Sequence, residues 1–340
     1  MTAPSAPRSE EPRSPSQISE GPLTSGQSAL VLELAAAARQ ADGVAPLSEH
    51  VLLHLRHAAP PRGGRPPRTP PEVPLGAERS RDLLLLAGDT AAGYAHLDSP
   101  DGSDTGGAGD MSGELVVHPA HRRQGHGTAL IDALVTGASG RGIRLWAHGD
   151  LPAAAALART AGFTRVRALW QMRMSLAGPP IGGPVLPAGI TLRTFRRGRD
   201  EQAWLRVNRR AFADHPEQGS WTMADLELRE AEPWFDPAGF FLAERDGELV
   251  GFHWTKVHQA EAGAPPIGEV YVVGVDPAAQ GGGLGRALTL AGLAHLQGRG
   301  LEQVMLYVDE SNEPAVKMYS ALGFALRSTD VMYLRALTGP

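Results

Sequence analysis

Hydrophobic and polar positions follow the same order in both halves of the chain. In each half a strand-like apolar run ends in a proline and leads into a glycine-rich segment, at 114–119 in the first copy and at 269–277 in the second. Apolar residues then recur on one face with helical spacing: Ala129, Leu130 and Ala133 in the first copy, Ala287, Leu288 and Ala291 in the second. The pattern predicts a strand, a glycine turn and a helix, twice.

A further strand and a further helix follow in each copy. Apolar runs at 143–147 and 304–308 predict strands, and the helix after each one ends near Gly162 or Gly323, where glycine is a natural C-cap. Each half therefore predicts the order β-β-β-α-β-α-β after a helical start. An internal repeat of this kind predicts two tandem domains of the α/β class, each built on a mixed sheet.

Changes in composition suggest where these domains begin and end. The first domain is expected at 28–175 and the second at 189–337, with a linker rich in glycine and proline at 176–188. Residues 1–27 are rich in proline, serine and charge, which predicts a disordered tail. The proline- and arginine-rich segment 58–78 predicts a stiff surface insertion in the first domain.

Composition narrows the class of protein. The 340 residues exceed what one hydrophobic core usually serves, and 42% hydrophobic with 20% charged residues is typical of a globular protein. A formal net charge of −5 argues against nucleic acid or membrane as the main partner. The absence of cysteine excludes disulfides, thiolate zinc sites and a cysteine nucleophile. Without a signal sequence or an apolar run of roughly 20 residues, we expect a cytoplasmic protein. A monomer is expected because paired modules already bury a pseudo-dimer interface.

The two glycine turns have the features of a pyrophosphate cradle. In both copies the proline lies six residues before an aligned glycine, Gly125 or Gly283, which opens a helix. Glycines let the backbone approach phosphates, and the first helical turn supplies free N–H groups. A Walker loop would end in Gly-Lys-Ser/Thr, and a Rossmann turn would need a third glycine where Leu130 and Leu288 stand. The reading that remains is the coenzyme A turn of the GNAT N-acetyltransferases, and its repetition makes coincidence a poor explanation.

The second copy also carries residues for acetyl transfer. Transfer to an amine needs a base, an oxyanion donor and an acid for the departing thiolate. Glu269 opens the strand before the cradle, and we expect it to act as the base through a water molecule. Tyr319 on the last helix is expected to act as the acid. Asn312 is expected to cap the last helix or to contact the pantetheine arm. The N–H of Val273 is expected to be the oxyanion donor. A glutamate at a strand end is often a solvated edge residue, and a helical tyrosine often only packs, so both predictions depend on the cradle.

The first copy lacks these groups. The same offsets from its proline and its last glycine place Met111 where Glu269 stands, Leu151 at Asn312 and Ala158 at Tyr319. Glu114 is out of register with Glu269 by three positions. The first domain is therefore predicted to be non-catalytic, with a structural role or with a bound CoA that it does not turn over.

Four segments carry a closer resemblance: 42–46, 212–219, 234–237 and 251–258. None belongs to the general GNAT pattern, and from about residue 41 onward the chain resembles the mycothiol synthases (mycothiol acetyltransferases), a family of tandem-domain GNAT enzymes. The resemblance implies acetyl-CoA-dependent N-acetylation of the cysteinyl amine of Cys-GlcN-myo-inositol (desacetylmycothiol), giving mycothiol and CoA. Arg122 and His126 in the first cradle depart from the usual pattern.

The resemblance also implies binding residues. Substrate contacts fall on Glu49, Glu217, Lys256, Glu269 and Tyr307. Acetyl-CoA contacts in the first domain fall on Leu115, Val116, Val117, Arg123, Gln124, Gly125, His126, Gly127 and Thr128. In the second domain they fall on Val273, Gly274, Val275, Gln280, Gly281, Gly282, Gly283, Leu284, Gly285, Arg286, Asn312, Glu313, Pro314, Ala315, Val316 and Lys317. Because Glu49 belongs to the first domain, the substrate pocket is expected to take residues from both halves.

Other functions remain as alternatives. A tandem GNAT enzyme could acetylate another small-molecule or peptide amine, or the chain could be a non-catalytic acyl-CoA sensor. His50, His54 and His57 share one helical face, but no metal signature accompanies them, so we expect no metal and a solvated face. A Ser-His-Asp hydrolase is disfavoured because no G-x-S-x-G motif occurs.

Overall fold

The computed structural model describes residues 17–57, 80–99, 109–213, 216–260 and 265–336. The chain forms two compact units, 1–166 with 331–340, and 167–330. Each unit is a mixed sheet with helices on both faces, as the repeat predicts.

The first unit contains a sheet in the order β1-β2-β3-β4-β5-β12, in which the pairing of β4 with β5 is parallel. Its strands are β1 (Gln17–Glu20), β2 (Ser80–Ala87), β3 (Thr90–Asp98), β4 (Met111–Val117), β5 (Ile143–Ala147) and the last part of β12 (Ala325–Arg335). Its helices are α1 (Ser25–Asp42), α2 (Glu49–His57), α3 (His126–Gly137) and α4 (Pro152–Thr160).

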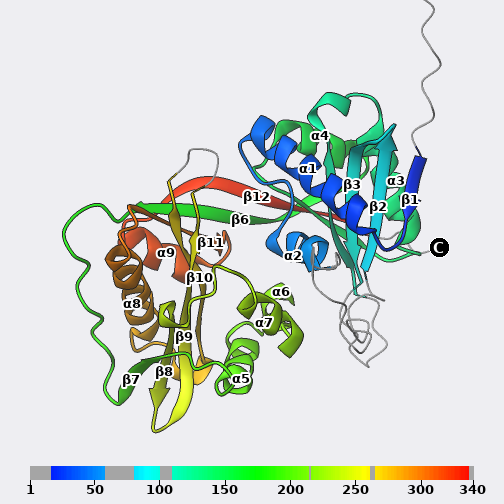
Figure 1. Ribbon diagram of the computed structural model, residues 1–340. Coiled ribbons are helices and arrows are strands. Elements are labelled where there is room, and N and C mark those ends of the chain that lie inside the picture. The colour runs from blue at the N-terminus through cyan, green and yellow to red at the C-terminus, as the bar shows by residue number, and fades with distance from the viewer. Residues whose placement is uncertain (1–16, 58–79, 100–108, 214–215, 261–264, 337–340) are drawn as a thin grey trace, which may run out of the picture. The chain divides into compact units, whose positions relative to one another are not determined.

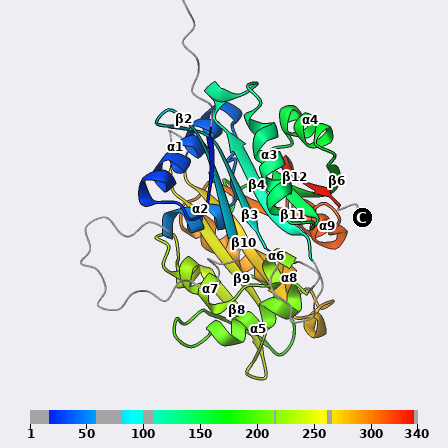
Figure 2. The same ribbon diagram turned by 90° about the vertical axis from the view of Figure 1, so that its right-hand side faces the viewer.

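Alternation along β2 explains how this sheet holds helices on both faces. Leu83 and Leu85 pack in one apolar cluster with Leu130 of α3, while Leu84 packs in another with Leu34 of α1. Successive side chains of a strand point to opposite faces. Helices α1 and α2 therefore cover one face, and α3 and α4 cover the other (Figure 2).

The predicted tail extends less far than expected. Residues 17–20 form β1 and pair with β2, and Thr24 caps α1 in a capping box with Gln27. The prediction of disorder over 1–27 is thus wrong for 17–27, because a short edge strand and a cap need few apolar residues. Residues 1–16 and the predicted insertion 58–78 lie outside the described residues.

The second unit contains a sheet in the order β6-β11-β10-β9-β8-β7, in which β10 and β11 are parallel. Its strands are the last part of β6 (Thr164–Ser175), β7 (Ile190–Thr194), β8 (Phe240–Arg245), β9 (Glu248–His258), β10 (Ile267–Val275) and β11 (Gln303–Asp309). Its helices are α5 (Glu201–Ala211), α6 (Pro216–Gly219), α7 (Met223–Glu230), α8 (Leu284–Gly298) and α9 (Glu313–Ala321).

Two kinds of core flank this second sheet. Trp204 of α5 and Leu226 of α7 pack with Phe240 and Trp254 in an aromatic cluster, in which Phe240 stacks on Trp254 at 4.5 Å. On the other face, Leu293 of α8 packs in an aliphatic cluster with strand residues of β10 and β11. Figure 1 shows α8 and α9 on one side of β8–β11 and α5 to α7 on the other.

Two strands change units along the chain. Residues 331–335 of β12 pair with β5 in the first unit, and residues 169–175 of β6 pair with β11 in the second. The expected boundaries placed 28–175 in one domain and 189–337 in the other, so the observed units differ from them at these two strands. Linear order along a chain does not reveal which sheet a strand joins.

Candidate active site

The cradle of the second unit lies at the junction of β10 and α8. Gly281 and Gly283 have φ angles of 86° and 79°, in the left-handed region that favours glycine. A Cβ added at Gly281, Gly282 or Gly283 would meet no atom within 4 Å, so the turn is open above its backbone. Gln280 Nε2 donates to the carbonyl of Val275 at 3.2 Å and fixes the turn to the strand. The free N–H groups at the start of α8 are therefore available to an anion.

The first unit repeats this cradle with different residues. Arg123 and Gly125 take the left-handed positions, at φ 63° and 86°, and Arg122 Nε donates to the carbonyl of Val117 at 3.2 Å. Arg122 also binds Asp42 through two hydrogen bonds of 2.7 Å. The departure at Arg122 thus preserves the bond to the strand and adds an ion pair with the end of α1.

Helix α4 narrows the first cradle. A Cβ built on Gly127 would lie 2.9 Å from Leu157 of α4, whereas the nearest atom to one on Gly285 is Val275 Cγ2 at 3.8 Å. The first turn of α8 therefore has more free space than the first turn of α3.

Beside each cradle, two parallel strands separate. The ladder between β10 and β11 ends at the pair Val270–Leu306, although β10 continues to Val275. In the first unit the ladder between β4 and β5 ends at Glu114–Trp146. Beyond these points the two ladders do not include the segments 115–117 and 273–275, so the backbone groups of these segments can pair with an extended ligand as an added strand would. These are the segments predicted to contact the pantetheine arm.

A β-bulge distinguishes the two copies. Tyr271 is an extra residue between Val270 and Val272 in the pairing of β10 with β9, whereas the pairing of β4 with β3 has no shift in register. Bulges often occur next to active sites, where they redirect a side chain. In this protein the bulge lies between the predicted base and the predicted oxyanion donor.

Because of the bulge, the residue of the first domain that corresponds to Glu269 is not the predicted one. Lys256, which pairs with Glu269, lies five residues after Gly251, and Asp98 lies five residues after the equivalent Gly93. Asp98 pairs with Ser112, so Ser112 and not Met111 is the structural counterpart. The predicted equivalence is wrong by one residue because a fixed offset cannot detect an inserted bulge. The prediction that the first copy lacks the base is unchanged, since serine offers no carboxylate.

Glu269 is buried next to the point where β10 and β11 separate, with 6% of its surface exposed. Its Oε2 lies 2.6 Å from Nε2 of His258. Lys256 is opposite Glu269 on β9 and is also buried, with its Nζ 4.4 Å from the ring centre of Trp234 and 5.0 Å from that of Tyr271. Aromatic rings therefore stabilise the lysine charge close to the carboxylate.

Tyr307 shares this face of the sheet. It lies two residues after Met305, which pairs with Glu269, so its side chain projects on the same side. Its hydroxyl accepts a hydrogen bond from Gln171 Nε2 at 2.8 Å. Loss of solvation and then the negative charge of Glu269 raise the pKa of Tyr307 above its ordinary value. The structure thus brings three predicted substrate residues together: Lys256, Glu269 and Tyr307.

Tyr319 lies on the opposite face. It is 8% exposed and packs against Phe324 in the aliphatic cluster with Leu306. Burial raises the pKa of Tyr319 to about 12, so its hydroxyl is protonated at neutral pH. Glu269 and Tyr319 therefore flank the separation of β10 and β11 from its two faces.

The counterparts predicted on the last helix of each copy agree with the structure. Phe324 N donates to the carbonyl of Tyr319 at 3.0 Å, and Phe163 N donates to the carbonyl of Ala158 at 2.9 Å. Asn312 is the N-cap of α9 and accepts from the N–H of Ala315 at 3.2 Å. Leu151, at the matching position before α4, makes no side-chain capping bond.

Two predicted substrate residues are described less fully. Glu49 is the first residue of α2, in the first unit. Glu217 belongs to α6, but its side chain lies outside the described residues. Their roles stay predictions.

Several residues near Glu269 were not predicted. Tyr271, the bulged residue, accepts a hydrogen bond from Arg229 Nε at 2.9 Å, and the Arg229 guanidinium lies 3.8 Å from the ring centre of Trp221. His258 contacts Glu269 directly. A signal for His258 was present in the sequence, because it lies two positions after Lys256 on a strand and must therefore share its face.

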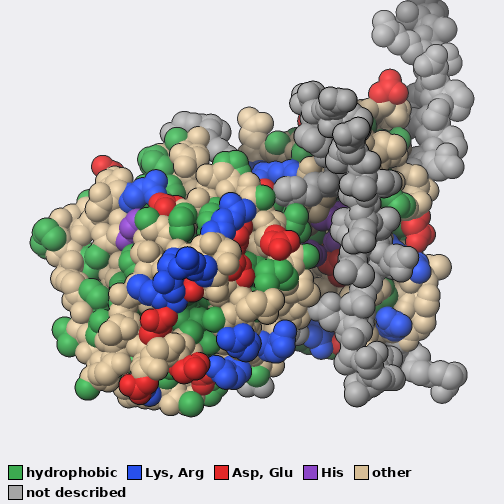
Figure 3. All heavy atoms as spheres, turned by 60° about the horizontal axis from the view of Figure 1, so that its bottom comes forward, with side chains coloured by type: hydrophobic (Ala, Val, Ile, Leu, Met, Phe, Trp, Pro, Cys, Tyr) green, Lys and Arg blue, Asp and Glu red, His purple; other side chains and the backbone are tan. Residues whose placement is uncertain are grey.

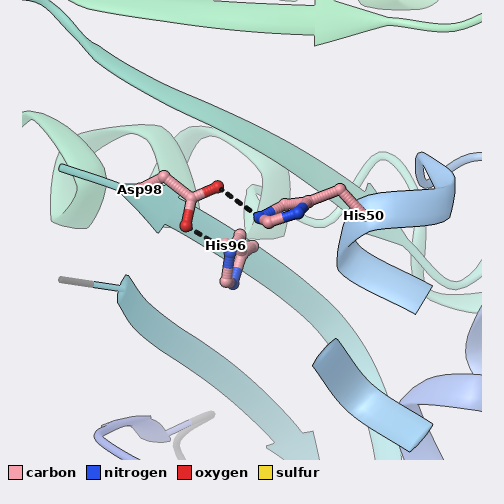
Figure 4. A group of neighbouring side chains, drawn as sticks. All are labelled: His50, His96 and Asp98. Atoms are coloured by element: carbon pink, nitrogen blue, oxygen red, sulfur yellow. Dashed lines mark hydrogen bonds and ion pairs between the residues drawn. The ribbon is translucent and has the colours of Figure 1, made fainter. Parts of the chain in front are cut away.

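His50 and His54 of α2 join a network centred on the buried side chains of Asp82 and His96. The His50 side chain is 55% exposed, in agreement with the predicted solvated face, whereas that of His54 is 28% exposed. Imidazoles and carboxylates alternate in the order His54, Asp82, His96, Asp98, His50, at distances of 3.1, 2.9, 3.0 and 3.3 Å. Figure 4 shows the end of this chain, where both His50 and His96 point to the carboxylate of Asp98. Each of these contacts joins a ring nitrogen to a carboxylate oxygen, as in a hydrogen-bonded chain. The side chain of His57 lies outside the described residues.

Arginines gather on the second unit near α5, but carboxylates bind them. Arg193 contacts both Asp200 and Glu244, and Arg210 contacts Asp276 at 2.6 Å. On the face drawn in Figure 3, acidic side chains lie among the basic ones. This pairing does not favour a site for a polyanion.

Comparisons with known proteins agree with this geometry. The model of the acetyltransferase (GNAT) family matches residues 52–163 and 203–324. The chain is 59% identical to a mycothiol acetyltransferase of Thermobispora bispora, over 92% of this chain and 97% of the relative. It is also 59% identical to a mycothiol acetyltransferase of Thermomonospora curvata, over 92% and 94%.

Solved structures show the same fold. A GCN5-related N-acetyltransferase from Sphaerobacter thermophilus is 25% identical, with a TM-score of 0.62 over 95% of this chain and 97% of that one. A tandem GNAT protein from the clavulanic acid biosynthesis pathway is 22% identical, with a TM-score of 0.67 over 95% and 99%.

Among the described residues, no helix is both long and apolar enough to cross a membrane. Acetyl-CoA is the co-substrate of the GNAT family, and the paired cradles and strand separations suit it. Two matches to the GNAT model and relatives that share more than half of its residues lead to one conclusion. The chain is an acetyltransferase with two GNAT domains in tandem, and it belongs to the mycothiol acetyltransferase family.

Proposed function

We propose that this enzyme transfers the acetyl group of acetyl-CoA to the cysteinyl amine of Cys-GlcN-myo-inositol (desacetylmycothiol), giving mycothiol and CoA. The observation that carries the proposal is the position of Glu269. This buried carboxylate lies beside an open CoA cradle, where β10 and β11 separate, in a chain whose relatives are named mycothiol acetyltransferases.

Glu269 acts as the general base. An α-amine has a pKa of about 8, so much of the substrate arrives as an ammonium ion that cannot attack a thioester. Glu269 removes a proton through a bridging water, and the neutral amine attacks the acetyl carbonyl. Lys256 and Tyr307 on the same face, with Glu217 of the same unit, replace water around the hydroxyl groups of the sugar and inositol.

The N–H of Val273 stabilises the tetrahedral oxyanion. Its position just after the bulge, on the segment of β10 that has left β11, supports this role. A fixed backbone donor stabilises developing charge without reorganising during the reaction.

Tyr319 acts as the general acid. It stays protonated because burial raises its pKa to about 12, and it donates its proton to the thiolate of the departing CoA. Its location on the face opposite Glu269 supports a direct transfer, in which base and acid approach the thioester from opposite sides.

The second cradle and α9 hold the nucleotide and pantetheine of acetyl-CoA through residues 273–275, 280–286 and 312–317. In the first unit the corresponding segments are 115–117 and 123–128. This copy has no carboxylate at Ser112 and no hydroxyl at Ala158, so we infer a structural role or a CoA molecule that is held without turnover. A monomeric state and a cytoplasmic location complete the proposal.

Mass spectrometry tests the proposal. Purified enzyme with acetyl-CoA and desacetylmycothiol should give a product heavier by one acetyl group, linked to nitrogen. Efficient acetylation of other amines in a panel, with none of desacetylmycothiol, would favour a different substrate. Binding of acetyl-CoA with no product from any amine would favour an acyl-CoA sensor.

A further inference from the structure

The proposed base must lose a proton in every catalytic cycle, although it is nearly inaccessible to solvent. The amine enters as an ammonium ion with three protons and leaves as an amide with one. One of the two departing protons ends on the sulfur of CoA, and the other must reach water. Because Glu269 is 6% exposed, a neighbouring group has to carry this proton outward.

The ionisable groups around Glu269 come from several elements. Strand β9 contributes Lys256 and His258, and β11 contributes Tyr307. The ammonium of Lys256 lies over aromatic rings, and the hydroxyl of Tyr307 accepts a hydrogen bond from Gln171.

More distant charges act through Tyr307 and Tyr271. The negative charge of Asp330 on β12 raises the pKa of Tyr307, and the positive charge of Arg173 on β6 lowers it. Arg229 of α7 donates to the hydroxyl of Tyr271. His258 binds the carboxylate of the proposed base directly, with Nε2 and Oε2 2.6 Å apart, and its own side chain is 35% exposed.

We propose that His258 is a positioning residue that orients Glu269 and takes its proton to solvent. This inference depends on the proposed function of Glu269 as the base. The contact comes from strand geometry: His258 pairs with Ile267, two positions before Glu269, so the two side chains are diagonal neighbours on one face. The imidazole thus joins a buried carboxylate to the surface.

Each proton that leaves the substrate nitrogen has an acceptor. The ammonium nitrogen loses one proton through water to Glu269, and the resulting amine forms the N–C bond to the acetyl carbon. The tetrahedral intermediate then breaks its C–S bond, the thiolate takes a proton from Tyr319, and the second proton from nitrogen restores Tyr319. Glu269 transfers its proton to Nε2 of His258, Nδ1 releases one to water, and exchange with water restores the original tautomer.

Steady-state kinetics of the full-length enzyme test this role. We expect His258→Gln to lower kcat about 10-fold with little change in KM for either substrate, because a glutamine can hold Glu269 but cannot take up its proton. The dependence of log kcat on pH should lose the ionisation that belongs to the histidine. His258→Ala should be equally slow, and added imidazole should restore part of its rate but none of the rate of His258→Gln.

A matched control is His295→Gln, which changes another partly buried histidine of the second unit, one that lies beside Asp236. Its kcat and pH profile should match those of the parent enzyme. If His258→Gln keeps the parent pH profile while Glu269→Gln is inactive, the proton route is wrong and the base stands. If Glu269→Gln retains full activity, the proposed function of Glu269 fails first.

Discussion

Individual residues decide which copy can perform chemistry. The sequence was sufficient to single out Glu269 and Tyr319 as candidates and to predict the cap at Asn312, because the repeat aligned them with residues that lack the required groups. It was not sufficient to find Ser112 as the counterpart of Glu269, since a bulge at Tyr271 adds one residue without changing the hydrophobic pattern. Contacts such as that between His258 and Glu269 require the pairing of strands, which a linear pattern does not contain.

Replacing the base should separate catalysis from stability. Glu269→Gln keeps the size of the side chain and a hydrogen-bonding oxygen for His258, so we expect a kcat lower by about 10²- to 10⁴-fold with a nearly unchanged melting temperature. Product formation and thermal unfolding measure the two effects. Loss of the folded state would leave the kinetics uninformative, and Glu269→Asp, which retains the charge, then serves as the second variant.

We expect Tyr319→Phe to impair protonation of the CoA thiolate as it leaves. Its hydroxyl has a pKa of about 12 and lies in an apolar cluster, so phenylalanine fits the same space. We expect kcat to fall about 10²-fold while the KM for acetyl-CoA stays within a factor of about three. Comparable losses in kcat and in acetyl-CoA affinity would instead indicate a packing role.

At the scale of elements, the hydrophobic pattern predicted each strand, turn and helix that forms the two cradles. The pattern failed for β1, whose four residues gain their order from pairing with β2 and not from their own composition. It also gave no information about the network of α2, β2 and β3, because histidines at helical spacing do not indicate which strand carries the carboxylates that His50 and His54 contact.

The two cradles should respond differently to the same change. Valine is strained at the left-handed positions of Gly125 and Gly283, at a cost of about 1–3 kcal/mol each. We expect Gly283→Val to raise the KM for acetyl-CoA strongly, and Gly125→Val to lower the melting temperature more than it lowers turnover. A collapse of turnover in Gly125→Val, with folding and CoA binding in the second unit intact, would contradict a non-catalytic first copy.

The buried network should make the stability of the first unit depend on pH. Burial alone would lower the pKa of His96, but hydrogen bonds to Asp82 and Asp98 outweigh it and raise the pKa to about 10. Burial would raise the pKa of Asp82, but hydrogen bonds from His54, His96 and Tyr94 outweigh it and hold the pKa far below its usual range. The histidine contribution is complete below about pH 6.5 and is lost as the pH rises through 10, while the aspartate contribution is complete above about pH 4 and is lost as the pH falls.

Thermal unfolding across pH 4 to 10 measures this dependence. The melting temperature of the first unit should be highest between about pH 4 and 6.5 and should fall toward pH 10. His96→Gln should lower stability overall, because it leaves two buried carboxylates without their shared partner, and should flatten the alkaline decline. An equally steep decline in His96→Gln would show that other groups cause it.

At the scale of the whole molecule, the sequence predicted two tandem units but not the strands that complete them. Each half of the chain carries one strand that pairs in the other unit: 169–175 in the first half and 331–335 in the second. Both segments consist of ordinary strand-forming residues, so nothing in their composition indicates their destination.

This exchange limits how the gene can be divided. A fragment that ends at the linker 176–188 keeps residues 169–175 without the strand β11 that they pair with, and it lacks residues 331–335, which complete its own sheet. We expect either fragment alone to be insoluble when expressed and the two together to reassemble into an active enzyme, as measured by co-purification and turnover. Independent folding of the two fragments would contradict the exchange. The two halves of the repeat are therefore mutually dependent, because each unit needs a strand that the other half of the gene encodes.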